Sequence, residues 1–144
     1  MVRLEVNRTI AAAPEPVFDW LTEPTNLTSA PLFLRVYWAD GYTAPSVGAI
    51  RQGLVVGAWL REVITAYDAP HSYSYLVVRS VPPAKHDGGT VTLTPTGDGT
   101  HVEWVTSYSI PRRAGGKLTE AVTERLFRSS FNAILAACAK ALET

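Results

Sequence analysis

The chain has 144 residues, and its 13 Lys and Arg residues balance 13 Asp and Glu residues, which argues against nucleic acid or an anionic membrane as a partner. Hydrophobic residues make up 47% of the chain, which excludes a disordered protein and is enough for one domain, residues 1–144, with its own core. A single cysteine, Cys138, excludes an internal disulfide. No apolar run reaches the ~20 residues of a membrane span and no signal peptide is recognisable, so we expect a cytoplasmic protein.

The first predicted elements are a strand and two short helical turns. Apolar and polar residues alternate from Val2 to Ile10, as expected for a half-buried strand. Proline is tolerated in the first turn of a helix, so residues 16–21 are predicted as a short helix that Pro24 ends. A second short turn is expected at residues 26–30, followed by a strand at residues 32–38.

The middle of the chain is typical of a meander of strands. Residues 47–55 and 59–67 form a predicted hairpin that turns at Gly57, and residues 72–80 form the next strand. Residues 81–89 contain prolines and glycines and are predicted to be the longest loop.

A tight hairpin at residues 91–104 leads into a strand that ends near Ile110. One face of this strand is amphipathic, because it combines apolar and hydrogen-bonding side chains. Its residues are Val102, Trp104, Thr106, Tyr108 and Ile110, and we expect them to point inward.

One long helical pattern fills the rest of the chain after a helix breaker at residues 111–116. The apolar residues of its two halves lie on different sides of the predicted helix. The second half carries an apolar stripe of Phe127, Phe131, Ile134, Cys138 and Leu142. Apolar residues of the first half, Leu118, Val122 and Leu126, lie about 150° away from that stripe. Either the helix bends near Arg125, or its first half overlooks a solvent-filled space, as at the mouth of a cavity. We expect the mobile Gly115-Gly116 segment to admit a ligand there.

Strands that meander by hairpins and end in a single long helix predict an α+β fold. We expect a curved antiparallel sheet of about six or seven strands wrapped around the C-terminal helix. A strongly curved sheet cannot touch a straight helix along its whole length, so a cavity for an apolar ligand is expected between them.

Four segments carry a resemblance that spans the chain: residues 12–21, residues 61–70, residues 93–100 and the terminal helix. In their order and spacing the chain resembles the START-like, helix-grip (SRPBCC) superfamily, in its polyketide cyclase/dehydrase-like branch. The resemblance implies a helix-grip fold, which hosts carriers, cyclases and co-chaperone modules. The Trp and Arg pattern associated with bacterial aromatase/cyclases is present only in part, as Trp59-Leu60-Arg61.

Aromatic side chains predicted on the inner faces are the candidate ligand-binding residues. They are Tyr37, Tyr73, Tyr75, Trp104, Tyr108, Phe127 and Phe131. Phenolic hydroxyls inside an apolar cavity would lack partners, which would favour a ligand that carries oxygen.

The candidate catalytic residues are Glu62 and Arg79. Glu62 shares parity with Leu60 and Ile64, so it either points into the cavity, where a carboxylate could transfer protons, or lies outside in solvent. Three arginines have apolar neighbours on their strands, so each could also point either into the cavity or to the outer face. They are Arg35, Arg51 and Arg79. The histidines show no metal-ligand spacing, so we expect neither a metal nor a cofactor.

The sequence favours a binding protein for a hydrophobic or aromatic small molecule, such as a lipid or polyketide-like compound, present as a monomer or weak homodimer. The enzymatic alternative is a polyketide cyclase or aromatase in which Glu62, Tyr75, Tyr108 and Arg79 move protons. A third alternative, a co-chaperone-like module, would need an exposed apolar patch.

Overall fold

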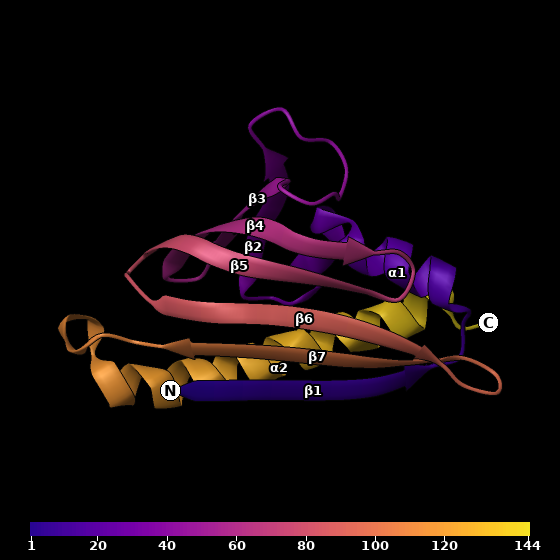
Figure 1. Ribbon diagram of the computed structural model, residues 1–144. Coiled ribbons are helices and arrows are strands. Elements are labelled where there is room, and N and C mark those ends of the chain that lie inside the picture. Colours follow the sequence, from indigo (N-terminus) through magenta and orange to yellow (C-terminus); the bar gives the residue numbers. More distant parts are fainter.

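The computed structural model describes residues 1–144 as one curved sheet with a long helix across its concave face (Figure 1). The strands are β1 (Val2–Ile10), β2 (Phe33–Ala39), β3 (Ile50–Val55), β4 (Ala58–Asp68), β5 (Ser72–Val81), β6 (Lys85–Pro95) and β7 (Thr100–Ser109). The helices are α1 (Pro14–Thr22) and α2 (Gly116–Leu142), and the 3₁₀ turns are η1 (Pro24–Ser29) and η2 (Arg112–Ala114). The predicted α+β fold is confirmed.

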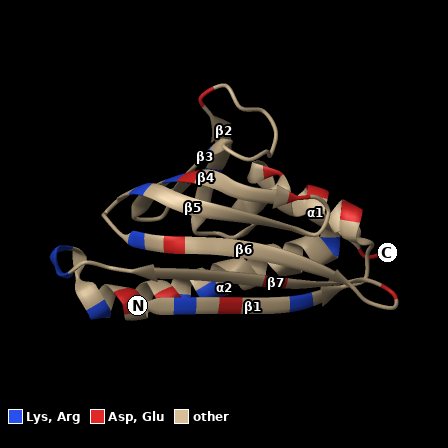
Figure 2. Cartoon of the chain, in the orientation of Figure 1, with Lys and Arg blue, Asp and Glu red and all other residues tan.

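The seven strands are all antiparallel, in the order β1-β7-β6-β5-β4-β3-β2. Every neighbour after β1 is also a neighbour in sequence, so hairpins build most of the sheet. The predicted inward face of β7 is confirmed, because Val102, Trp104, Thr106 and Tyr108 are all buried. Lys and Arg residues and Asp and Glu residues are interspersed along the strands and helices (Figure 2).

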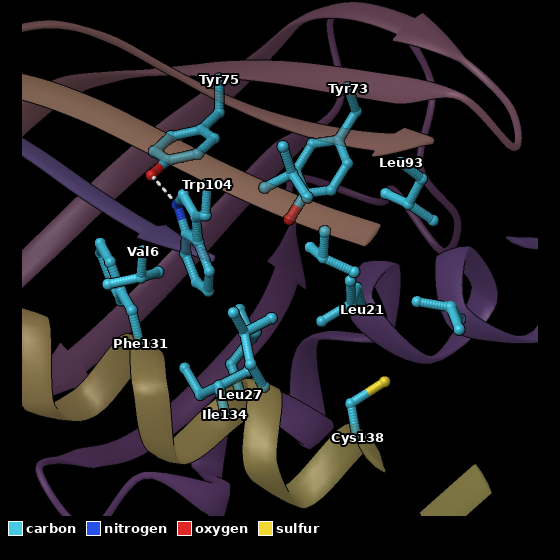
Figure 3. Packing of buried hydrophobic residues seen from close by; sticks show 14 of the residues in the cluster. Val6, Leu21, Leu27, Tyr73, Tyr75, Leu93, Trp104, Phe131, Ile134 and Cys138 are labelled. Atoms are coloured by element: carbon cyan, nitrogen blue, oxygen red, sulfur yellow. Dashed lines mark hydrogen bonds between the residues drawn. The ribbon is translucent and has the colours of Figure 1, made fainter. Parts of the chain in front are cut away.

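The core lies where the second half of α2 meets the sheet and α1 (Figure 3). Ile134 and Cys138 are fully buried there, and Phe131 lies beside Trp104 of β7. Burial raises the pKa of the Cys138 thiol to about 12, helped by the charge of Glu143, so Cys138 behaves as a small core residue.

The first half of α2 turns its apolar side chains away from the sheet. Leu118 is 76% exposed, and Val122 and Leu126 are exposed as well. The opposite side is polar and faces the protein: Glu120 accepts a hydrogen bond from the backbone N–H of Ile110. The exposure of these three residues agrees with the second of the two predicted alternatives, in which this half of α2 lies beside open space.

The predicted loop at residues 81–89 is wrong. Only residues 82–84 connect β5 to β6, and the glycines lie within β6. Gly88 has a φ of 111° and sits where the pairing of β6 with β7 shifts its register, so the glycine serves a β-bulge.

Candidate functional site

A cavity of about 260 Å³ lies between the sheet and the first half of α2. Of its 27 lining residues, 17 are hydrophobic. The β3–β4 turn, the β5–β6 turn and η2 also contribute to its wall, through residues such as Val56, Pro82 and Ala114. Val56 and Leu126 are both lining residues and exposed, so the cavity opens to solvent between the β3–β4 turn and α2.

Five of the seven predicted ligand-binding residues line this cavity: Tyr75, Trp104, Tyr108, Phe127 and Phe131. The indole of Trp104 stacks on Phe131, with ring centroids 3.9 Å apart and planes at 11°. Phe127 contacts Tyr108 edge to face at 6.2 Å. These contacts hold the rings in fixed orientations, so the aromatic wall is preformed.

The structure places Tyr37 and Tyr73 outside the cavity wall. Tyr73 points to the inner face, but it lies near the start of β5, beside α1. Its ring packs in the core against Phe18 of α1, with the two ring centroids 6.0 Å apart. Tyr37 lies on the outer face of β2, since its neighbour Val36 is buried, and its hydroxyl donates to Oε1 of Gln52 at 2.7 Å.

The expectation of unpartnered phenolic hydroxyls is wrong. Trp104 Nε1 donates to the Tyr75 hydroxyl at 2.8 Å (Figure 3). The Tyr108 hydroxyl lies 2.7 Å from Oγ1 of Thr123 on α2. Tyr75 therefore supports Trp104, and its replacement by Phe would leave the buried indole N–H without its acceptor.

Glu62 points inward, but it is not an isolated acid. It lies directly opposite Arg51 in the β3–β4 pairing, and Arg51 Nε and Nη2 both donate to Glu62 Oε2, the former at 3.0 Å. Arg51 is only 3% exposed. Burial opposes its charge, but the Glu62 carboxylate, together with Tyr73 and Tyr75, outweighs that effect, and these groups hold the pKa of Arg51 above its ordinary value.

The other two arginines considered from the sequence lie outside. Arg79 is exposed, with its guanidinium carbon 6.0 Å from the ring centroid of Trp59. Arg35 is also exposed and lies over the ring of Tyr37 at 4.6 Å. Of the three arginines for which an inward position was left open, the structure thus brings Arg51 together with Glu62, and it leaves the candidate catalytic residue Arg79 outside.

His86 lines the cavity from β6, in a segment that the sequence pattern predicts to be a loop. The backbone N–H of Val77 donates to its Nδ1 at 2.9 Å, so the ring proton resides on Nε2, which lies 2.6 Å from Oγ1 of Thr106. The imidazole stacks on Tyr75 with centroids 5.5 Å apart, and the Arg51 guanidinium lies 5.5 Å from the Tyr75 ring centroid. We call Arg51, Glu62, Tyr75, His86 and Thr106 the polar cluster.

Acidification should destabilise the fold through His86. Burial lowers the pKa of His86 below its ordinary 6.5 and outweighs the opposing charges of Glu62 and Asp87. The unfolded chain then binds this proton more readily than the folded one, so stability is complete above pH 6.5 and declines as the pH falls through the lowered pKa. Urea titrations of the wild type across this range should show the decline, and His86→Gln should reduce it.

The matched control for this experiment is His71→Gln, which removes an exposed imidazole at the turn between β4 and β5. This variant should keep the wild-type decline. An identical pH dependence in His86→Gln and the wild type would contradict the assignment of the effect to the buried ring.

Because Gly89 has no side chain, the ring of Tyr75 can occupy its position in the cavity wall. The two residues are paired across β5 and β6, and a Cβ on Gly89 would lie 2.3 Å from Cζ of Tyr75. Gly89→Ala should therefore displace the phenol and cost about 1–3 kcal/mol of unfolding free energy. Urea melts followed by Trp fluorescence measure the loss. Gly97→Ala is the control, since nothing lies within 4 Å of its Cβ, and equal stability of the two variants would argue against this role.

Comparisons with known proteins agree with this architecture. A family model described as polyketide cyclase / dehydrase and lipid transport matches residues 1–143, which confirms the resemblance predicted from the sequence. A search of curated protein sequences finds no match. No helix of the structure is long and apolar enough to cross a membrane.

Several solved structures are similar to this chain. A protein from Thermus thermophilus has a TM-score of 0.78 at 16% identity, over 96% of this chain and 95% of that one. Major latex-like protein 151 from Panax ginseng has a TM-score of 0.73 at 13% identity, over 99% and 98% of the two chains. The Aha1 dimer from Colwellia psychrerythraea has a TM-score of 0.68 at 14% identity, over 99% and 97%. At such identities the likeness shows the fold alone.

Proposed function

The chain belongs to the polyketide cyclase/dehydrase and lipid-transport family, and on that premise we propose that it binds a hydrophobic or aromatic small molecule between the sheet and α2. The observation that carries the proposal is the preformed cavity of about 260 Å³ with its mostly apolar wall. Burial of the ligand's apolar surface would supply most of the binding free energy. The stacked pair of Trp104 and Phe131 offers a flat surface for a ring system.

The size of the cavity limits the ligand. A cavity of about 150 Å³ is known to hold benzene, and pockets for drug-sized ligands begin near 300 Å³. A volume of about 260 Å³ therefore suits a ligand with about ten to fifteen non-hydrogen atoms inside the protein. A longer molecule would extend past Val56 and Leu126 into solvent.

The hydrogen-bond partners of the polar cavity residues favour a binding function over cyclisation chemistry. A general base needs a free lone pair within reach of the substrate. Both ring nitrogens of His86 are engaged by the protein, and Arg51 occupies one of the two carboxylate oxygens of Glu62, which leaves Oε1 as its only free acceptor. The polar side chains of the cavity wall are therefore better placed to orient a bound ligand than to transfer protons to or from it.

Native mass spectrometry of the purified protein tests the proposal. We expect a co-purified molecule, or a one-to-one complex with an added bicyclic aromatic compound. Ala58→Trp places an indole on the cavity wall and should abolish binding, whereas Ala44→Trp makes the same change on an exposed loop and should preserve it. Equal binding by both variants, or no binding by the wild type, would contradict the proposal.

A further inference from the structure

We infer that the polar cluster selects an uncharged polar group on the ligand, one that both donates and accepts a hydrogen bond, over a carboxylate of the same shape. The inference rests on the proposed function, because it concerns the same cavity. Its support is the charge balance of the wall and the hydrogen-bonding positions that the protein leaves open.

The charge balance comes from a single ion pair. Among the 27 residues that line the cavity, only Arg51 and Glu62 carry full charges, and each neutralises the other. Burial also lowers the pKa of His86, so the imidazole adds no positive charge at neutral pH. A ligand carboxylate would therefore lose its hydration without gaining an unpaired cation, and a ligand ammonium would meet the same cost.

The open hydrogen-bonding positions lie around the same pair. Arg51 Nε and Nη2 converge on one oxygen, Glu62 Oε2, which leaves Oε1 of Glu62 as an acceptor. The Tyr75 hydroxyl accepts from Trp104, so its own proton is available to a ligand oxygen. Glu62 and Tyr75 both line the cavity, so these positions lie at its wall.

The matching ligand group follows from this set. Glu62 Oε1 requires a donor, and the Tyr75 hydroxyl requires an acceptor. A carboxamide, or a hydroxyl beside a carbonyl, supplies both. A carboxylate has no donor for Glu62 and would place a second negative charge near it. The ligand class is therefore an apolar molecule with an uncharged amide or hydroxy-carbonyl group.

Isothermal titration calorimetry with three probes of one shape tests this inference. Naphthamide, naphthoate and methylnaphthalene share a ring system that suits the cavity, and they differ only in the polar group. At neutral pH the wild type should bind naphthamide at least about tenfold more tightly than naphthoate, the amount that one unpaired buried group commonly costs. Methylnaphthalene should bind more weakly than the amide, because it leaves the cluster unmatched.

A charge-removing variant should change the order of the probes. Glu62→Gln leaves Arg51 without its carboxylate, so naphthoate should gain affinity relative to naphthamide by at least about tenfold. Glu124→Gln removes a carboxylate from an exposed pair on α2, outside the cavity, and should keep the wild-type order. If Glu62→Gln does not fold, the wild-type comparison decides alone.

The outcomes that contradict this inference can be distinguished from those that contradict the proposed function. Equal or tighter binding of naphthoate by the wild type would overturn the inference and leave the proposed function intact, because a ligand would still enter the cavity. Failure of all three probes to bind would count against the proposed function, and against this inference with it.

Discussion

Truncation of Ile134 to Ala should lower the free energy of unfolding by about 2–5 kcal/mol. Ile134 is fully buried on the apolar stripe of α2, where the helix packs on the sheet. Removing its side chain loses hydrophobic transfer free energy and leaves a void that the stacked aromatic rings cannot fill without moving. Phe131→Ala should fall in the same range, because the ring stacks on Trp104. Urea melts followed by circular dichroism measure both losses.

The control for these variants lies on the same helix. Leu118 is 76% exposed, so Leu118→Ala should change the stability by no more than about 0.5 kcal/mol. A comparable loss in Leu118→Ala and Ile134→Ala would mean that the contrast between the two halves of α2 is wrong. This contrast matters for function, because the half that does not pack on the core is the one that borders the cavity.

The parts of the fold that could be predicted from the sequence are those with a local pattern. The alternation in β7 identified its buried face, and the mismatch between the two halves of α2 indicated the cavity mouth. Both signals depend only on the period of a strand or helix. The pairing of Arg51 with Glu62 also had a local signal, since a two-residue turn at residues 56–57 places them opposite each other. Without the register of that turn, the sequence left Arg51 as one of three arginines that could face the cavity.

Other parts of the site had no such signal. His86 lies in a segment whose prolines and glycines favour a loop, and it becomes a cavity residue only because a bulge at Gly88 lets the strand continue. Tyr73 and Tyr75 have the same parity, so the sequence could not tell that one meets the core while the other meets the cavity. That difference arises from where α1 and α2 cross the sheet, which is a long-range property of the fold.

Removal of the Glu62 carboxylate should be among the most destabilising single changes in this protein. Arg51 is 3% exposed and has no other carboxylate partner, so Glu62→Gln leaves a buried guanidinium uncompensated. A change of this kind costs about 3–5 kcal/mol of unfolding free energy. Urea melts at neutral pH measure the loss. Glu124→Gln, which breaks the exposed pair with Arg128, should cost less than about 1 kcal/mol.

The double variant Arg51→Met/Glu62→Leu separates the two roles of the ion pair. If the loss in Glu62→Gln comes from an unpaired charge, replacing both partners by apolar residues should recover most of the stability. Stability as low in the double variant as in Glu62→Gln would instead mean that the pair itself holds β3 and β4 together. With the stability recovered, the cavity wall would carry no fully charged side chain, and the double variant should bind naphthamide no more tightly than methylnaphthalene. The pair would then be retained for what it selects rather than for how much it stabilises the fold.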